Sequence, residues 1–293
     1  MPALSVHHLN CASIQGLSIL GQHLVCHVLL IETASGLVLV DTGLGTSDYA
    51  AISSRLGVGF ARGYARPKVD PSLAAIRQIE ALGHDPRDVR HIVQTHLDLD
   101  HVGGLSDFPW AKVHVHATEL KAALARSGPK ARGRYRPRMW EHDPQWVTYR
   151  TGGDPWFGFE SVRELEGLPA EILMVPLFGH THGHVGVALD TVDGWLLAAG
   201  DAYFDAREVK QPRRRCAPGP ALFQLVVTTE YRTRRRNQDR LRAFAAEHPE
   251  VAMYAAHNPF EYAELAGAAG DRLRGMYVSS NRSHPDRMPI AAA

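Results

Sequence analysis

A short stretch of the sequence, residues 95–104, gathers the side chains best suited to metal chemistry. Within six residues it places two imidazoles and two carboxylates, those of His96, Asp98, Asp100 and His101. Zinc, manganese and iron accept these ligand types, and a short loop can fold all four around a pair of ions. The alternative is a polar loop that is merely rich in His and Asp.

The elements before and after this stretch predict how it is positioned. Residues 89–94 have the composition of a strand, and a helical pattern precedes them over residues 71–82 and stops at Gly83. Because sites in α/β proteins lie at the carboxyl ends of strands, we expect the ligands to follow directly from this strand. Gly103 and Gly104 come next and allow the backbone to turn tightly beside the ions.

Other apolar strands of the chain also end in a His or an Asp. The predicted strands are residues 37–40, which close a hairpin with 25–31, and residues 171–177, 195–200 and 251–256. The residues that follow them are Asp41, then His180, His182 and His184, then Asp201, and last His257. Asp41 on its own is more readily a turn residue. Together these strand ends predict one shared site, because clustered buried charge is costly without a cation.

Two other segments leave alternatives open. Residues 127–160 mix basic and aromatic side chains, which can line a ligand pocket or stack on nucleic acid. We favour the pocket, because the formal net charge of the chain is only +1. Residues 228–247 have a helical pattern that predicts Arg232 and Arg234 on a solvated face and Leu241 in the core.

The composition is that of an ordinary globular protein, with 293 residues, 45% hydrophobic and 22% charged. The three cysteines, Cys11, Cys26 and Cys216, are odd in number and widely spaced, so we expect no disulfide framework. Residues 1–21 lack the pattern of a signal peptide, and no apolar run reaches membrane-spanning length. These features together predict a cytoplasmic protein.

Taken together, the motifs resemble the metallo-β-lactamase superfamily of metal-dependent hydrolases, within its lactonase and glyoxalase II-like group. The family pattern is His-x-His-x-Asp-His, a His in a Gly-His-Thr loop, an Asp in a Gly-Asp pair and a late His. The matching residues are His96, Asp100, His101, His180, Asp201 and His257, with Asp41 as the early acidic residue. The resemblance implies an α/β fold, the αβ/βα four-layer sandwich of two mixed sheets with outer helices. It also implies a single domain over residues 1–293, with an insertion at about 127–160 and a loose tail at about 281–293.

The resemblance further implies a dinuclear site. The first ion would take His96, His180 and, if it does not turn away, Asp98; the second would take Asp100, His101 and His257; Asp201 would bridge them. Asp98 stands where the family has its second His. Three carboxylates then face two divalent ions. The extra negative charge of Asp98 would weaken the first ion as a Lewis acid and would favour manganese or iron over the zinc otherwise expected.

The implied activity is hydrolysis of an ester-like bond, a lactone or a carboxylic ester, by a hydroxide held between the two ions. Asp100 would pass a proton to the leaving group, and His182 and His184 would be outer partners or pocket residues. The family's lactonases carry a Tyr shortly after the bridging Asp; here Tyr203 comes one residue early and Phe204 occupies the place. The alternatives are a thioesterase of the glyoxalase II type, a phosphotriesterase, a nucleic-acid processing nuclease and a non-catalytic ligand-binding member. The expected partner is a small molecule, without nucleic acid or membrane, and a homodimer is left open.

Overall fold

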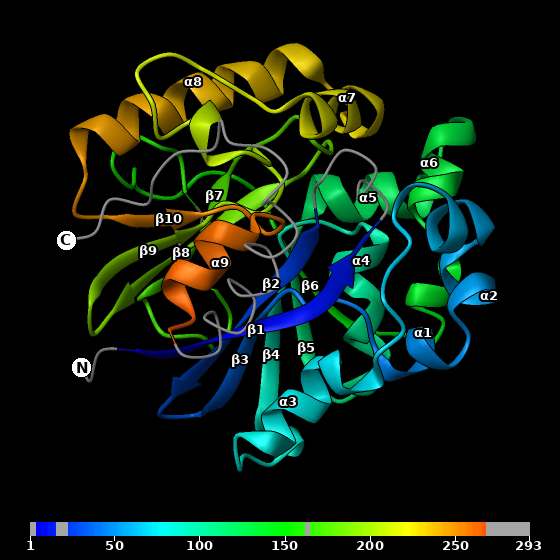
Figure 1. Ribbon diagram of the computed structural model, residues 1–293. Helices are drawn as coiled ribbons and strands as arrows, with labels where there is room; N and C mark the ends of the chain where they lie inside the picture. Colours follow the sequence, from blue (N-terminus) through cyan, green and yellow to red (C-terminus); the bar gives the residue numbers. More distant parts are fainter. Residues whose placement is uncertain (1–3, 16–22, 162–164, 268–293) are drawn as a thin grey trace.

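A computed structural model describes residues 4–15, 23–161 and 165–267 of the chain, and two β-sheets form its centre (Figure 1). The first sheet has the strand order β1-β2-β3-β4-β5-β6. Its strands are β1 (Ser5–Ile14), β2 (Leu24–Thr33), β3 (Gly36–Val40), β4 (Val89–Val93), β5 (Lys112–His116) and β6 (Gln145–Tyr149). The first three strands pair antiparallel and β3 to β6 pair parallel, so the sheet is mixed.

The second sheet has the order β10-β9-β8-β7 and is also mixed, since only β10 and β9 are parallel. Its strands are β7 (Ile172–Pro176), β8 (Val185–Thr191), β9 (Gly194–Ala198) and β10 (Ala252–Tyr254). The α-helices are α1 (Thr46–Ala50), α2 (Ile52–Leu56), α3 (Ala75–Ala81), α4 (Leu99–Val102), α5 (Ala117–Ala125), α6 (Gly128–Arg134), α7 (Pro218–Val227), α8 (Tyr231–Glu247) and α9 (Pro259–Leu265). The other helical turns are η2 (Gly59–Tyr64), η3 (Pro71–Leu73), η4 (Pro86–Asp88), η5 (Gly103–Asp107), η6 (Pro137–Met139) and η7 (Ala206–Glu208).

Three layers of buried side chains hold the sheets and helices together. Successive residues of a strand point to opposite faces, so each sheet contributes to two layers. The layer between the sheets contains Leu29, Ile31, Val38, Val40, Val93, Ile172, Met174, Val187 and Leu189. The opposite face of the first sheet packs on α3 and α5 through Val28, Leu30, Leu39, Ile92, Ile79 and Ala123. The opposite face of the second sheet packs on α8 through Leu173, Val175, Ala188, Leu197, Leu241 and Phe244. This is the predicted αβ/βα sandwich.

Most of the predicted strands are confirmed, and the helices differ more. The helix expected over residues 71–82 is interrupted at Ala74, whose extended backbone (φ −58°, ψ 136°) separates η3 from α3. The helix expected over 228–247 forms as α8, with Leu241 buried as predicted and Phe244 also buried. The solvated position predicted for Arg234 is wrong, because its side chain is buried.

Residues 127–160 contain regular structure that the sequence did not predict. Helix α6 and the turn η6 occupy the first part, and β6 pairs in parallel with β5. The expected tail at 281–293 lies outside the described residues. The three cysteines are all free, as predicted. In the part of the chain that the structure describes, no helix is long and apolar enough to cross a membrane.

His114 of β5 is buried, although its alternating pattern is typical of a strand with one wet face. The Tyr149 hydroxyl accepts from the Glu166 amide (2.8 Å) and forms a hydrogen bond with His114 Nδ1 (2.8 Å). Nε2 of His114 forms a hydrogen bond with His91 Nδ1 at 2.8 Å. Burial, with a smaller effect from the charge of His91, lowers the pKa of His114 to about 3.

This histidine predicts a loss of stability in acid. In the unfolded chain the same imidazole takes up its proton at about pH 6.5. Between about pH 3 and that value, the unfolded state therefore binds more protons than the folded state. The stabilisation from neutral His114 is complete above that pH and is lost as the pH falls toward 3. We expect His114→Gln to flatten the pH dependence of the free energy of unfolding by roughly 1.4 kcal/mol per pH unit below about pH 6.

Denaturant titrations at several pH values measure this slope. His182→Asn, at an imidazole whose side chain is 48% exposed, serves as the control and should keep the wild-type slope. An unchanged slope in His114→Gln would contradict the prediction.

Candidate metal centre

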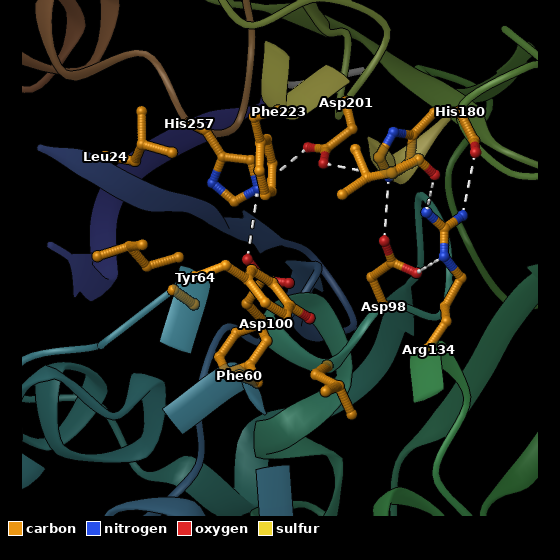
Figure 2. Close-up of a pocket in the computed structure, with 14 residues that line it drawn as sticks. Leu24, Phe60, Tyr64, Asp98, Asp100, Arg134, His180, Asp201, Phe223 and His257 are labelled. Atoms are coloured by element: carbon orange, nitrogen blue, oxygen red, sulfur yellow. Dashed lines mark hydrogen bonds and ion pairs between the residues drawn. The ribbon is translucent and has the colours of Figure 1, made fainter. Parts of the chain in front are cut away.

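The predicted ligands come together from four segments that each follow a strand, and Figure 2 shows five of them, Asp98, Asp100, His180, Asp201 and His257, around one pocket. His96 follows β4, and Asp98 is the N-cap residue of α4, which carries Asp100 and His101. The other three, His180, Asp201 and His257, follow β7, β9 and β10. Residues separated by up to 161 positions are thereby brought into one cluster.

Asp201 lies between two pairs of imidazoles. Its Oδ2 atom is 3.8 Å from His96 Nε2 and 3.4 Å from His180 Nε2. Its Oδ1 atom is 3.4 Å from His101 Nε2 and 3.3 Å from His257 Nε2. Ligand atoms of a tetrahedral zinc ion lie about 3.3 Å apart, given metal–ligand distances of about 2.0–2.1 Å. The first triad, His96, His180 and Asp201, and the second triad, His101, His257 and Asp201, therefore have the spacing of two ligand sets that share one carboxylate.

Four buried polar atoms of these residues have no hydrogen-bond partner, namely His96 Nε2, Asp98 Oδ1, His180 Nδ1 and Asp201 Oδ1. Two of them, His96 Nε2 and Asp201 Oδ1, face the other ligand atoms of the cluster. His96 is fully buried and Asp201 is 3% exposed, so leaving these atoms unsatisfied is costly. A divalent cation in each triad would satisfy both atoms. The donor set, imidazole and carboxylate, is the one that zinc and related ions take.

Hydrogen bonds outside the cluster turn the imidazoles of His96 and His101 toward Asp201. Asp41 Oδ2 accepts from the Thr95 hydroxyl (2.7 Å) and from His101 Nδ1 (2.8 Å). Because the Thr95 hydroxyl donates to Asp41, it accepts from His96 Nδ1 at 2.9 Å. Both imidazoles thus have Nδ1 engaged and Nε2 facing the cluster, which is the usual arrangement for a histidine ligand. Asp41 occupies the place expected for an outer partner.

His257 and His184 are fixed in the same way by backbone groups. His257 Nδ1 donates to the Val25 carbonyl at 2.7 Å and leaves Nε2 for the cluster. His184 Nδ1 donates to the Leu177 carbonyl (3.0 Å), and its Nε2 accepts from the Asp201 amide (2.8 Å). Burial and the charge of His180 lower the pKa of His184 to about 3, so it stays neutral. His184 therefore orients the Asp201 backbone.

The charge of Asp201 acts on the protonation of His101 and His257. Burial alone would lower the pKa of both imidazoles, but the charges and hydrogen bonds of neighbouring groups, Asp201 first among them, together outweigh it and raise both values well above the usual range. Burial likewise disfavours the Asp201 carboxylate, yet the neighbouring histidines hold its pKa well below normal. Protons and cations thus compete for the same Nε2 atoms.

Asp98 is paired with an arginine. Its Oδ2 atom is 3.0 Å from His180 Nε2 and 3.5 Å from His96 Nε2, whereas its Oδ1 atom is 3.1 Å from Arg134 Nε. Burial would raise the pKa of Asp98, but the charges of Arg134 and His96 keep it well below the usual range. Asp98 therefore remains a carboxylate that presents Oδ2 to the first triad.

Arg134 ties α6 to the loops that carry the ligands. Its guanidinium donates to the carbonyl oxygens of His180 (3.0 Å) and Val227 and to the Thr229 hydroxyl (3.2 Å). The sequence analysis weighed three carboxylates against two divalent ions and did not include Arg134. The positive charge of Arg134 offsets the negative charge of Asp98, so the net formal charge equals that of a site with a neutral histidine in place of Asp98.

Of three further residues predicted near the site, the structure brings only Phe204 to it. His182 is exposed and pairs with Glu230 at 2.7 Å, so the structure does not bring it to the cluster. Tyr203 is buried and its hydroxyl donates to Glu261 at 3.0 Å, outside the pocket. Phe204 stacks on the imidazole of His257, with ring centroids 5.3 Å apart.

Glu119 of α5 is a site residue that the sequence analysis missed. Its fully buried carboxylate accepts from the Leu97 amide (3.1 Å), the Gly183 amide (3.0 Å) and the Tyr135 hydroxyl (3.1 Å). It therefore joins the loop that carries His96 to the loop that carries His180. A single Glu in a helical pattern offers no signal for this role, because both partners are distant in sequence.

We expect Glu119→Gln to destabilise the protein by about 1–3 kcal/mol, because the amide cannot accept all three hydrogen bonds and leaves a buried N–H unsatisfied. Chemical denaturation measures the change. Glu80→Gln on the surface of α3 is the control and should be neutral within about 0.5 kcal/mol. A neutral effect of Glu119→Gln would show that the carboxylate does not hold the two loops.

Gly103 and Gly104 are explained by close packing. A Cβ atom on Gly103 would lie 2.0 Å from Asp48 Oδ2, and one on Gly104 would lie 2.9 Å from the Thr42 carbonyl oxygen. Neither glycine has a positive φ angle. We predicted glycine at these positions because of a tight turn. In the structure glycine is needed because η5 packs closely against the segment that follows β3.

Comparisons with known proteins agree with this geometry. The model of the metallo-beta-lactamase superfamily matches residues 21–245. A probable metallo-hydrolase of Mycobacterium tuberculosis is 39% identical over 262 residues, which cover 89% of this chain and 82% of that protein. An N-acyl homoserine lactonase of Bacillus thuringiensis is 36% identical over 98 residues, covering 33% of this chain and 38% of that protein.

Solved structures share the fold. A crystal structure of a mutant of the B. thuringiensis protein AiiA, with N-decanoyl-L-homoserine bound at the active site, has a TM-score of 0.67 at 19% identity and covers 88% of this chain and 94% of its own. A dizinc quorum-quenching lactonase, AidC, has a TM-score of 0.54 at 14% identity and covers 88% and 85%. With the match of the family model and the relative from M. tuberculosis, these findings establish that the chain belongs to the metallo-β-lactamase superfamily.

Proposed function

We propose that this protein is a metal-dependent hydrolase that cleaves an ester-like bond, either a lactone or a carboxylic ester. The observation that carries the proposal is the pair of buried ligand triads sharing Asp201. They border a cavity of about 60 Å³ that opens to solvent and is lined by both apolar and charged side chains, as small-molecule sites are.

The proposed ligand sets follow from the distances. His96, His180 and Oδ2 of Asp98 would hold the first ion, and Asp100, His101 and His257 the second, with Asp201 between them. Such ions, when bound, supply Lewis acidity that lowers the pKa of water to about 7 and polarises a scissile carbonyl. Zinc is our first choice and manganese or iron the alternatives, because Arg134 offsets the extra carboxylate.

The pocket walls suit a substrate with an apolar part. The apolar lining consists of Ile14, Leu24, Phe60, Ala65, Leu99, Phe223 and Val227. The polar lining includes Asp98, Asp100 and Arg134. An acyl or aryl group would bind along the apolar wall while the ester faces the carboxylates. Asp100 lines the same space, and we propose that it carries the proton to the leaving oxygen.

Relatives named as N-acyl homoserine lactonases support a lactone substrate. However, Phe204 stands where the resemblance to the family's lactonases would place a Tyr. Tyr64, at the end of η2, lines the pocket and offers another phenol. Partial burial, followed by the charges of Asp100 and Asp98, raises the pKa of Tyr64, so it stays protonated and can donate to a carbonyl oxygen. We propose that Tyr64 binds the ester group.

We expect Tyr64→Phe to lower kcat/KM for the best substrate by about tenfold, the value of one hydrogen bond of about 1.4 kcal/mol. Steady-state kinetics measure the change. Tyr231→Phe is the matched control, since Tyr231 is 49% exposed against 48% for Tyr64 and does not line the pocket. Equal kinetics for Tyr64→Phe and the wild type would remove Tyr64 from the mechanism.

The nuclease alternative is less well supported. Several basic residues that suggested it are engaged inside the fold. Arg134 contacts Asp98, Arg214 contacts the buried Glu208 at 2.7 Å, and Arg234 is itself buried. Strong, salt-dependent retention of the protein on DNA or RNA would favour this alternative again.

A substrate panel tests the proposed function. The panel contains acyl homoserine lactones, aryl carboxylic esters, a thioester and a phosphotriester, each with and without chelator. We expect turnover of a lactone or carboxylic ester that the chelator abolishes. Turnover of only the thioester or only the phosphotriester would replace the proposal by the corresponding alternative, and a metal-loaded protein without turnover would favour a ligand-binding role.

A further inference from the structure

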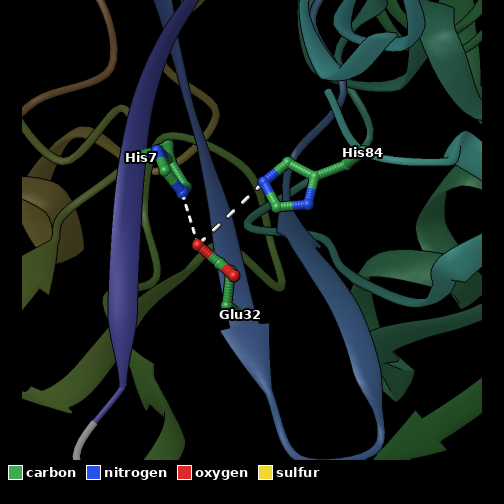
Figure 3. Close-up of side chains that lie close together, drawn as sticks. All are labelled: His7, Glu32 and His84. Atoms are coloured by element: carbon green, nitrogen blue, oxygen red, sulfur yellow. Dashed lines mark hydrogen bonds and ion pairs between the residues drawn. The ribbon is translucent and has the colours of Figure 1, made fainter. Parts of the chain in front are cut away.

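A second group of ligand-type side chains lies outside the pocket, on the first sheet and the turn after α3 (Figure 3). It consists of His7 of β1, Glu32 of β2 and His84. One nitrogen of each imidazole and one oxygen of Glu32 all lie within 4.8 Å of one another. We propose that these three residues form a further binding site for a divalent transition-metal ion, with zinc as the best fit.

The backbone places the three side chains together. In the antiparallel pair of β1 and β2, Ser5 is opposite Glu32 and His7 is opposite Leu30. His7 and Glu32 are therefore diagonal neighbours on one face, a spacing that long side chains bridge. Gly83, with φ +87°, ends α3 and turns the chain so that His84 comes to the same face.

The distances suit a zinc ion after small rotamer changes. His7 Nε2 is 2.7 Å from Glu32 Oε1, and His84 Nε2 is 4.0 Å from the same oxygen. These values lie on either side of the ligand–ligand distance of about 3.3 Å in a tetrahedral zinc site. Two histidines and one glutamate are a ligand set found in zinc proteins that leave one position to water. The side chains are 26–42% exposed, so solvent can reach that position.

This site is separate from the candidate metal centre. Leu24 at the start of β2 lines the pocket, whereas Glu32 lies eight residues further along the strand. At about 3.3 Å per residue, that separation is roughly 26 Å. The hydrogen bond from His7 lowers the pKa of Glu32, so the carboxylate is ionised and ready to bind a cation. An ion held here would join the edge strand β1 to the turn between α3 and β4.

The test is the number of zinc ions bound per chain at equilibrium with buffered free zinc, in Glu32→Gln, His84→Gln and wild-type protein. We expect the wild type to bind one ion more than either variant, and zinc affinity at this site to fall at least about tenfold in both. Excess zinc should raise the Tm of the wild type more than that of the variants, because the ion crosslinks β1 to a turn.

His248→Asn is the matched control. It removes a part-exposed imidazole that pairs with Glu250 at 3.1 Å but belongs to no triad of ligand atoms among the described residues. This variant should bind as much zinc as the wild type. Equal stoichiometry in the wild type, Glu32→Gln and His84→Gln would overturn the proposal, as would loss of the same ion in His248→Asn. In Asp201→Asn protein the additional ion should remain, so the result does not depend on the candidate metal centre.

Discussion

Replacing Asp201 with asparagine is expected to lower turnover of the best ester substrate by about 10³-fold or more, because Lewis acidity contributes several kcal/mol to such reactions. Each oxygen of Asp201 faces two imidazoles. An amide would carry no charge and would turn an N–H donor toward one of the triads. Both triads lose their shared carboxylate, so the variant should retain neither ion.

The measurements are kcat under saturating metal and metal content after dialysis. Asp193→Asn, in the turn between β8 and β9, is the control and should match the wild type, because Asp193 lies outside the pocket. Undiminished turnover in Asp201→Asn would rule out its role as a shared ligand.

Replacing Arg134 with glutamine is expected to destabilise the chelator-treated protein by about 3–5 kcal/mol, because it leaves a buried carboxylate uncompensated. The pair is well shielded, with side-chain exposures of 8% for Arg134 and 15% for Asp98. Arg134 also donates to His180 and Thr229, so the single variant loses more than the ion pair. Arg134→Lys keeps the charge without the planar donor geometry and should lie between the wild type and Arg134→Gln.

A double-mutant cycle isolates the ion pair. In an Asp98→Asn background no charge is left to compensate, so Arg134→Gln should cost less there by about 1–3 kcal/mol. Denaturant unfolding of the four proteins in chelator gives the coupling energy. An identical loss in both backgrounds would show that Arg134 acts only through its contacts to the ligand loops. It would then have no part in offsetting Asp98.

The cluster of ligand-type side chains could be predicted from the sequence because local features determine their positions. His96, Asp98, Asp100 and His101 are close in sequence, and the remaining ligands follow strands whose ends meet at one edge of the sandwich. Individual core strands could likewise be predicted, because strands that are buried on both faces have few polar residues, whereas the layered sandwich was implied only by the resemblance to the family. The resemblance to the family supplied the order in which these parts assemble.

The residues that complete the site could not be predicted in the same way. Arg134 is one of several arginines in its segment, and only the packing of α6 shows that it reaches Asp98, 36 residues earlier. Glu119 looks like any surface residue of a helix until its contacts to Leu97 and Gly183 are known. Tyr203 was the nearest phenol in sequence, yet Tyr64 is the one that lines the pocket.

Some elements were missed for a related reason. Strands β1 and β6 and helices α7 and α9 carry no local signal strong enough to place them, and β6 depends on its pairing with β5. The sequence has a continuous helical pattern over residues 71–82, but the extended backbone of Ala74 divides it into η3 and α3. Tertiary packing overrides the weak helical preference of such a short segment.

The most direct measurement is the metal content per chain, by elemental analysis of protein purified without chelator. The protein should carry His84→Gln, so that an ion at the surface site does not add to the count. Our account predicts two divalent ions per chain in this protein and none after Asp201→Asn is added. One ion or none in the His84→Gln protein, or two ions that survive the loss of Asp201, would contradict the claim that this carboxylate joins two metal sites.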